Sequence, residues 1–398
     1  MRATWPDWLW LIDMALPTIQ YVERAGLIDL GWGHPAPSAL PVRLWHDCQQ
    51  EALRRFSWRA LTYGYAAGPG ALVEWLCDRL GGIDARAPVP AEVFVTAGAS
   101  QAIELVSTLL TRPGDCVVVD SPTYHLALRI LADREVELVG APADEAGIDP
   151  RATGDLLRRL NANGRRVPLL YLVPTFANPT GRSLPAVRRR ELVEVARDAG
   201  TVIVEDDAYR ELVYDGMAPP SLWSLASGRG VIRVGSFSKT VGPGLRLGWI
   251  NAEPEIVRAL VGRGFVDSVG GLNHATALAM AVMGSSGGYD QHVRAMRATY
   301  RDQRDALVAA LCAELPGLEV AAPPGGWFLW LRLPSGMPAT RLLAGAERHS
   351  VSFLPGTLFY PQPAGDDYFR LSFSMYGPVE LVQAAQRLGR AYAEMRLA

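Results

Sequence analysis

Lys239 is the clearest candidate in this sequence for a residue that does chemistry. It is the only lysine in the 398-residue chain, because 38 of the 39 basic residues are arginine. Arginine supplies surface charge as well as lysine does, so a composition biased against lysine indicates that position 239 needs a primary amine. Such an amine can be deprotonated and can form an imine with a carbonyl compound. The alternative is the chance survival of one surface lysine.

The neighbours of Lys239 favour a phosphate-bearing ligand. Ser236 and Ser238 lie in a glycine-rich turn after an apolar strand pattern, and Arg246 follows a few residues later. Two hydroxyl groups and a guanidinium could supply the donors and the positive charge that a phosphate monoester needs. Lys239 could hold an aldehyde on the same ligand. A loop rich in serine and glycine is weak evidence alone, and the sole lysine inside it strengthens the functional interpretation.

Acidic residues end a second apolar strand pattern. Asp206 and Asp207 follow residues 202–205, and a carboxylate at the carboxyl end of a buried strand is costly unless it is paired. Open α/β sheets bind ligands at that end of their strands. A carboxylate there could keep a pyridine nitrogen protonated, which makes the ring an electron sink. The structural alternative is that Asp206 or Asp207 is a helix N-cap.

Three further polar segments follow strands or open helices. Asn178 lies in the run Ala-Asn-Pro-Thr-Gly, which is either a turn or an amide directed at the ligand. Ala99 and Ser100 open a helical pattern whose free backbone N–H groups suit a phosphate. Tyr124 also opens a helical pattern, where it could stack on a planar ring, although an isolated tyrosine is more often a core residue.

The elements that must position these residues alternate between strands and helices. Such a rhythm predicts an α/β architecture with a mostly parallel sheet. We expect strands at residues 93–96, 116–120, 135–139, 169–173, 202–205, 231–235 and 247–251. Helical patterns at residues 100–110, 124–132, 155–161 and 185–199 lie between them.

The pattern changes near residue 285. A long helical stretch at 289–314 precedes a strand at 327–333, a helix at 339–349, two short strands at 351–354 and 368–373, and a final helix at 378–395. We therefore expect three parts. Residues 1–45 form an N-terminal arm and part of the small domain, residues 46–285 the large domain, and residues 286–398 a small α+β domain.

Composition argues against several classes of function. The formal net charge of −2 gives no positive field for nucleic acid or an anionic membrane. No stretch is long and apolar enough to span a membrane, and the apolar start at 5–16 lacks the features of a signal peptide. The four cysteines form no CxxC pair, so we expect no metal site and a reduced, cytoplasmic location.

Taken together, these segments resemble the pyridoxal 5'-phosphate (PLP)-dependent aminotransferases of fold type I, class I/II, which have the aspartate aminotransferase fold. The resemblance covers nearly the whole chain and rests on AxNPTG, EDDAYRE, GSFSKT…GLRLGW, PGGWFLW and FRLSFS at fitting intervals. The most similar subgroup contains 2-aminoadipate and kynurenine aminotransferases and the aminotransferase-like domains of MocR regulators. The resemblance implies a seven-stranded large domain, a smaller α+β domain and ping-pong transamination.

The resemblance also implies roles in cofactor binding. Lys239 forms the Schiff base and carries the proton between the substrate Cα and the cofactor. Asp206 pairs with the ring nitrogen, with Asp207 as the weaker candidate. Asn178 and Tyr209 contact the 3'-oxygen, and Tyr124 stacks on the ring. The phosphate falls to Ala99, Ser100, Ser236, Ser238 and Arg246. The run Gly-Ala-Ser-Gln at 98–101 differs from the more polar run common in the subgroup. Its contacts with the phosphate can therefore differ from those of the subgroup.

Substrate and subunit contacts follow in the same way. Arg370 resembles the arginine that clamps the substrate α-carboxylate, a task that suits its planar fork. Gly33 resembles a backbone contact near that carboxylate. Tyr63 resembles the tyrosine that reaches the phosphate of a partner subunit, which implies a homodimer with shared active sites.

The N-terminal arm departs from the subgroup. No basic residue lies between Arg2 and Arg24, whereas acidic residues and tryptophans do. Subgroup enzymes that favour dicarboxylates use a basic residue in this arm. We therefore expect an aromatic or cationic amino acid, including non-standard ones, as the substrate of a specialised pathway.

Two other classes stay open at this point. The fold also hosts PLP-dependent lyases, decarboxylases and oxidases, which share the lysine, aspartate and phosphate contacts. The presence of Arg370 favours transamination over these. A ligand-sensing regulator domain is the other alternative, and the short stretch before Gly33 shows no basic recognition helix.

Overall fold

A seven-stranded sheet forms the centre of the molecule. The computed structural model describes residues 19–20, 24–268 and 271–397. The order across the sheet is β2 (Val93–Thr96), β10 (Gly248–Asn251), β9 (Val231–Ser236), β8 (Val202–Asp206), β7 (Leu169–Leu172), β3 (Cys116–Val119) and β4 (Glu137–Gly140). Only β10 runs antiparallel to its neighbours, and every other adjacent pair is parallel. The predicted mostly parallel sheet is confirmed.

Helices cover both faces of this sheet because its strands are buried on both sides. Alternate residues of β3 show this, since Val117 and Val119 join the core under α3 and α4, while Cys116 and Val118 join the core under α5, α6 and α7. The helices of this part are α1 (Val42–Phe56), α2 (Gly70–Ile83), α3 (Ala99–Leu110), α4 (His125–Ala132), α5 (Pro150–Ala162), α6 (Ala186–Asp198), α7 (Leu222–Leu225), α8 (Pro254–Val261), α9 (Gly264–Asp267) and α10 (His274–Ser285).

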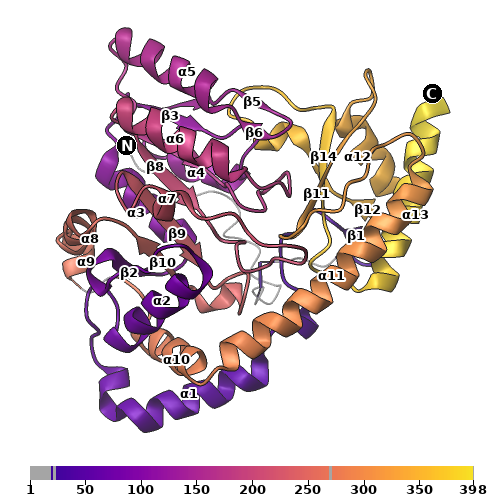
Figure 1. Ribbon diagram of the computed structural model, residues 1–398. Coiled ribbons are helices and arrows are strands. Elements are labelled where there is room, and N and C mark those ends of the chain that lie inside the picture. Colours follow the sequence, from indigo (N-terminus) through magenta and orange to yellow (C-terminus); the bar gives the residue numbers. More distant parts are fainter. Residues whose placement is uncertain (1–18, 21–23, 269–270, 398) are drawn as a thin grey trace, which may run out of the picture.

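A second group of elements comes from the last third of the chain and lies to one side of the large sheet, coloured orange to yellow in Figure 1. Its antiparallel sheet has the order β11 (Phe328–Arg332), β14 (Tyr368–Ser372) and β13 (Leu354–Pro355). Its helices are α11 (Gly288–Glu314), α12 (Ala339–Arg348) and α13 (Pro378–Leu397). The domain boundaries at residues 45 and 285 stay predictions.

The chain before Gly33 is attached to this second group. The short strand β1 (Ile28–Asp29) pairs in parallel with β12 (Val351–Ser352), and the N–H of Ser372 donates to the carbonyl of Leu30. A small hairpin of β5 (Ala143–Asp144) and β6 (Gly147–Ile148) completes the strands of the described residues. The arm predicted at residues 5–16 lies outside them.

Element ends differ from the predicted ranges by a few residues. The strand predicted at 135–139 is β4, which begins at Glu137, because the chain turns before it with Glu135 in the left-handed region at φ 54°. No helix within the described ranges combines the length and apolar character needed to cross a membrane.

Candidate active site

Strand alternation at the end of β8 separates three consecutive carboxylates. Successive side chains of a strand point to opposite faces of the sheet. Val204 and Asp206 therefore share a face, on which Val204 lies opposite Tyr171 of β7. The Tyr171 hydroxyl donates a hydrogen bond to Asp206 Oδ2 at 2.8 Å, and both residues are buried. Glu205 and Asp207 belong to the other face.

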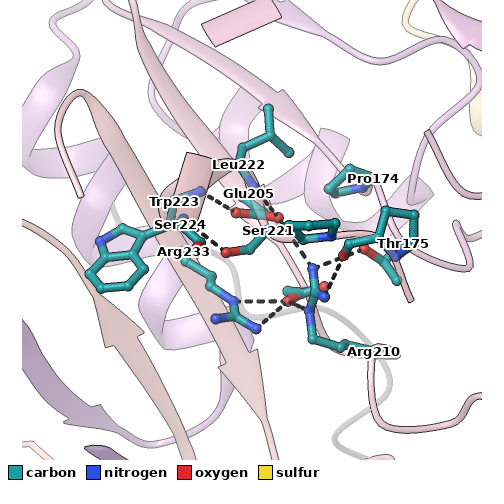
Figure 2. A network of polar contacts seen from close by, with 12 residues as sticks. Pro174, Thr175, Glu205, Arg210, Ser221, Leu222, Trp223, Ser224 and Arg233 are labelled. Carbon is teal, nitrogen blue, oxygen red and sulfur yellow. Dashed lines mark hydrogen bonds and ion pairs between the residues drawn. The ribbon is translucent and has the colours of Figure 1, made fainter. Parts of the chain in front are cut away.

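The other face holds a dense network of arginines and carboxylates, which Figure 2 shows from close by. Arg233 Nη2 lies 2.7 Å from Asp207 Oδ2, and Arg210 Nε also donates to this oxygen. Glu205 accepts hydrogen bonds from the N–H groups of Leu222 and Trp223, each at 3.0 Å, at the start of α7. Buried charges of this kind are tolerated because they are paired. The network ties the end of β8 to β9 and α7.

Asp206 has no arginine partner within the described residues. Apart from Tyr171, its hydrogen-bond donor is the backbone N–H of Ala208, at 3.4 Å from Oδ1. Burial raises the pKa of Asp206 to about 6, and the Tyr171 hydrogen bond opposes that rise. One carboxylate oxygen therefore keeps most of its accepting capacity for a ligand.

Lys239 follows β9 and its amine lies among aromatic rings. Its Nζ donates to the carbonyl oxygen of Gly33 at 3.1 Å and lies 4.7 Å from the ring centroid of Trp327. Burial, followed by the charges of Arg370 and Arg246, lowers the pKa of Lys239 to about 8, while Asp206 opposes the shift. An amine with such a pKa is deprotonated in a larger fraction of molecules at neutral pH than an ordinary lysine is.

Arg370 is a buried cation on β14 that has no carboxylate partner among the described residues. Its Nη1 donates to Asn178 Oδ1 at 2.8 Å, and its Nη2 donates to the carbonyl of Gly31. The guanidinium lies 4.2 Å from the ring centroid of Phe328. Burial lowers the pKa of Arg370 to about 10, so the side chain stays charged at neutral pH. A buried, unneutralised guanidinium is a ready site for an anion.

Two tyrosines connect Arg370 to Asp206. Tyr209, just after β8, is hydrogen-bonded to Asn178, and its pKa is raised mainly by burial. Tyr124, just before α4, has its pKa raised to about 12 by burial first and the charge of Asp206 second, while the charge of Arg370 opposes the rise. Both phenols therefore stay protonated at neutral pH and can donate hydrogen bonds.

A second set of donors gathers at the start of α3. Gly98 precedes the helix with φ 90° and makes no capping hydrogen bond, so the first N–H groups of Ala99 and Ser100 point outward. A Cβ on Gly98 would come within 2.6 Å of Arg246 Nη2, which shows how closely the guanidinium covers this helix end. Ser238 N–H donates to Ser236 Oγ at 3.1 Å beside it.

Comparison with known protein families identifies the family to which this chain belongs. The sequence profile described as aminotransferase class I and II matches residues 44–388. The chain belongs to this family. PLP is the cofactor of this aminotransferase, and its reaction is the transfer of an amino group.

Relatives of known name agree with this assignment. The chain is 33% identical to an aromatic-amino-acid aminotransferase of Thermococcus litoralis, over 94% of this chain and 90% of that one. It is 32% identical to a 2-aminoadipate transaminase of Thermus thermophilus, over 94% and 92%. The structure of a kynurenine aminotransferase of Pyrococcus horikoshii matches with a TM-score of 0.87 and 30% identity, over 93% and 91%.

Regulators of transcription are also similar to this chain. The uncharacterized HTH-type regulator YisV of Bacillus subtilis is 28% identical over 93% of this chain and 75% of its own length. This agrees with the resemblance to both aminotransferases and regulator domains.

Most residues that the sequence singled out lie close together within a single subunit. Lys239 is hydrogen-bonded to Gly33, and Arg370 is hydrogen-bonded to Asn178. Charge or hydrogen bonds link these residues to Asp206, Tyr209, Tyr124 and Arg246. Tyr63 is the exception. It is 84% exposed and lines a separate surface hollow with Leu272 and His274.

Sequence reasoning missed Tyr171, Trp327 and Phe328 as site residues. Tyr171 stood in a run of apolar residues, and its only signal was a hydroxyl in the strand next to that of Asp206. Trp327 and Phe328 belong to the PGGWFLW motif, to which no role was attached. The structure places Phe328 beside Arg370 and Trp327 beside Lys239.

Proposed function

We propose that this aminotransferase exchanges an amino group between a 2-oxo acid and an amino acid with an aromatic or cationic side chain, in two alternating half-reactions. The observation that carries the proposal is the buried Arg370, which has no carboxylate partner among the described residues and is hydrogen-bonded to Asn178. A guanidinium in this position binds the α-carboxylate that every amino acid and 2-oxo acid substrate carries.

The described residues fit PLP at three points. The start of α3, with Arg246 over it and Ser236 and Ser238 beside it, offers donors and charge for the phosphate. Asp206 keeps an open carboxylate oxygen for the ring nitrogen. Lys239 offers the amine for the aldehyde. When bound, PLP supplies this aldehyde and a protonated ring that withdraws electrons from the substrate Cα.

The protein's own groups then divide the work. Asp206 keeps the ring nitrogen protonated, while Asn178 and Tyr209 hold the 3'-oxygen and Tyr124 packs against the ring. Arg370 and the backbone of Gly33 hold the substrate carboxylate. Lys239 would hold the cofactor through its aldehyde and, once free, would serve as the general base that moves the proton of the substrate Cα. The pKa of about 8 supports this role, because both forms of the amine are accessible near neutral pH.

A homodimer completes the site in this proposal. An exposed apolar surface surrounds Tyr63, to which Trp58, Leu61, Tyr65 and Phe265 contribute. Exposed apolar surfaces of this kind mark association sites. Tyr63 extends from this surface to the phosphate of the partner subunit.

The substrate side chain is the finer part of the proposal. The acidic and tryptophan-rich arm from which it was predicted lies outside the described residues. Among those described, Trp32 and His34 flank Gly33 with ring centroids 5.1 Å apart, and Phe328 lies next to Arg370. These rings favour an aromatic side chain, as does the similarity to an aromatic-amino-acid aminotransferase. Three of the four free cysteines are buried, which fits the cytoplasmic location proposed.

An absorbance spectrum of the pure protein with PLP tests this function. We expect a yellow protein that aromatic amino acids bleach, with one 2-oxo acid released per amino group taken up. Release of carbon dioxide or peroxide instead would indicate a decarboxylase or an oxidase. Turnover of 2-aminoadipate far above that of aromatic and arginine-like amino acids would contradict the proposed side-chain class.

A further inference from the structure

Tyr171 is a buried polar residue next to the site to which the reaction proposed above gives no task. It lies in the middle of β7, is fully buried, and donates its hydroxyl hydrogen to Asp206 Oδ2 at 2.8 Å. Tyr124 and Tyr209 are close enough to influence its ionisation. Tyr171 therefore lies close to the groups proposed to surround the cofactor ring.

The three carboxylates at the end of β8 have different partners. Asp207 is bound by Arg210 and Arg233, and Glu205 lies 3.7 Å from Arg189. Arginine partners largely neutralise a carboxylate. Asp206, in contrast, has a neutral phenol as its only side-chain hydrogen-bond donor among the described residues.

We propose that Tyr171 is a positioning residue that orients Asp206 toward the cofactor ring nitrogen and favours its ionised form without cancelling its charge. A neutral donor on Oδ2 stabilises the anion and fixes the carboxylate plane, while Oδ1 stays open for a cationic partner. An arginine at the same place would compete with the pyridinium for the negative charge. This inference rests on the proposed role of Asp206.

The substitution Tyr171→Phe removes only the hydroxyl and keeps the buried ring. Asp206 then loses its donor and holds a proton more tightly, so the ring nitrogen carries less positive charge. A less positive ring makes Nζ of Lys239, when it is joined to the aldehyde carbon of the cofactor, more basic. We therefore expect the pH midpoint of the change in cofactor absorbance to rise by about one pH unit, since a hydrogen bond to a charged group is worth roughly that shift.

Cofactor affinity gives a second readout that is independent of activity. We expect Tyr171→Phe to weaken binding of PLP by about ten-fold, and to leave unchanged the binding of the analogue in which C–H replaces the ring nitrogen. General damage to the site would weaken both ligands equally, and that result would overturn the inference. The matched control is Tyr214→Phe, which removes another buried hydroxyl, bonded to the Gly326 carbonyl, and should match the wild type in both assays.

Two further variants separate this inference from the function on which it rests. If Asp206→Asn leaves the pH midpoint unchanged, the proposed role of Asp206 is wrong. If Asp206→Asn shifts the midpoint and Tyr171→Phe does not, the role of Tyr171 alone is wrong. A fluorinated tyrosine at position 171 is a stronger donor, so it should move the midpoint downward, and this variant keeps the test open should Tyr171→Phe fold poorly.

Discussion

The side-chain amine of Lys239 donates a hydrogen bond to the carbonyl oxygen of Gly33, 3.1 Å away and 206 residues earlier in the chain. Gly33 follows β1, which forms a two-stranded sheet with β12 of the group of elements from the last third of the chain. The chemical centre of the large sheet is thus in contact with a segment held by the other group of elements.

Substitution of Gly33 tests this contact. A Cβ at this position would lie 3.0 Å from Phe328 Cζ, tight enough that the ring or the backbone must shift. We expect Gly33→Ala to raise KM for the amino acid about ten-fold because the backbone moves away from the substrate carboxylate. The absorbance of the bound cofactor should stay unchanged. Steady-state kinetics measure the effect, and Gly31→Ala is not a suitable control because Asp29 lies 2.9 Å from its Cβ position.

Removal of the guanidinium fork at position 370 should affect substrate binding most. We expect Arg370→Lys to raise KM for both amino acid and 2-oxo acid by roughly 100-fold, because an ammonium group cannot bind a carboxylate in bidentate fashion. Arg332→Lys is the matched control, since Arg332 lies on the neighbouring strand and pairs with Asp367 at the surface. An unchanged KM in Arg370→Lys would show that Arg370 does not bind the substrate α-carboxylate.

Adjacent aspartates should give opposite results. Asp207→Asn weakens the pairing of two buried arginines, so we expect the free energy of unfolding to fall by about 3 kcal/mol. Asp206→Asn leaves no cation unpaired and should change stability little, while kcat/KM falls more than about 100-fold because the ring loses its counter-ion. Urea unfolding and initial rates on both variants check this. Equal losses of stability would contradict the separation of the two residues by the sheet.

The stability of the cofactor-free protein should depend on pH through Lys239. Its folded pKa of about 8 lies below the ordinary 10.5, so the unfolded chain binds the proton more tightly. The free energy of unfolding therefore rises as pH increases from 8 to 10.5. The destabilisation by the buried, charged amine is fully present below pH 8. We expect Lys239→Met to be more stable than the wild type by about 2 kcal/mol at pH 7. The difference should vanish above pH 10.5 in urea unfolding.

Mixed dimers test the sharing of the active site. Lys239→Ala and Tyr63→Ala should each be nearly inactive. In a mixed dimer, the Tyr63→Ala subunit supplies the lysine and its partner supplies the tyrosine, so one complete site forms. Unfolding and refolding the two together should restore about a quarter of wild-type activity, as expected for random pairing of subunits. If no activity returns, Tyr63 does not contribute to the active site of the partner subunit.

Sequence reasoning predicted the sheet well because buried parallel strands are short, continuous apolar runs. It also singled out Lys239, Asp206, Asn178 and Arg370, because each stands in a recognisable motif. It failed for Tyr171, because the pairing register that places its hydroxyl beside Asp206 is a three-dimensional property. The surroundings of Tyr63 could not follow from one chain, because its proposed contact belongs to a second copy.

Residue parity along β8 has a consequence for protein engineering. The even-numbered residue at its end, Asp206, faces Tyr171 and the proposed cofactor site, and the odd-numbered Glu205 and Asp207 face the arginine network that supports the strand. A mutational library at Asp206 can therefore explore new reactivity while the arginine network stays intact. Libraries that include the odd-numbered side will mostly yield chains that fail to fold.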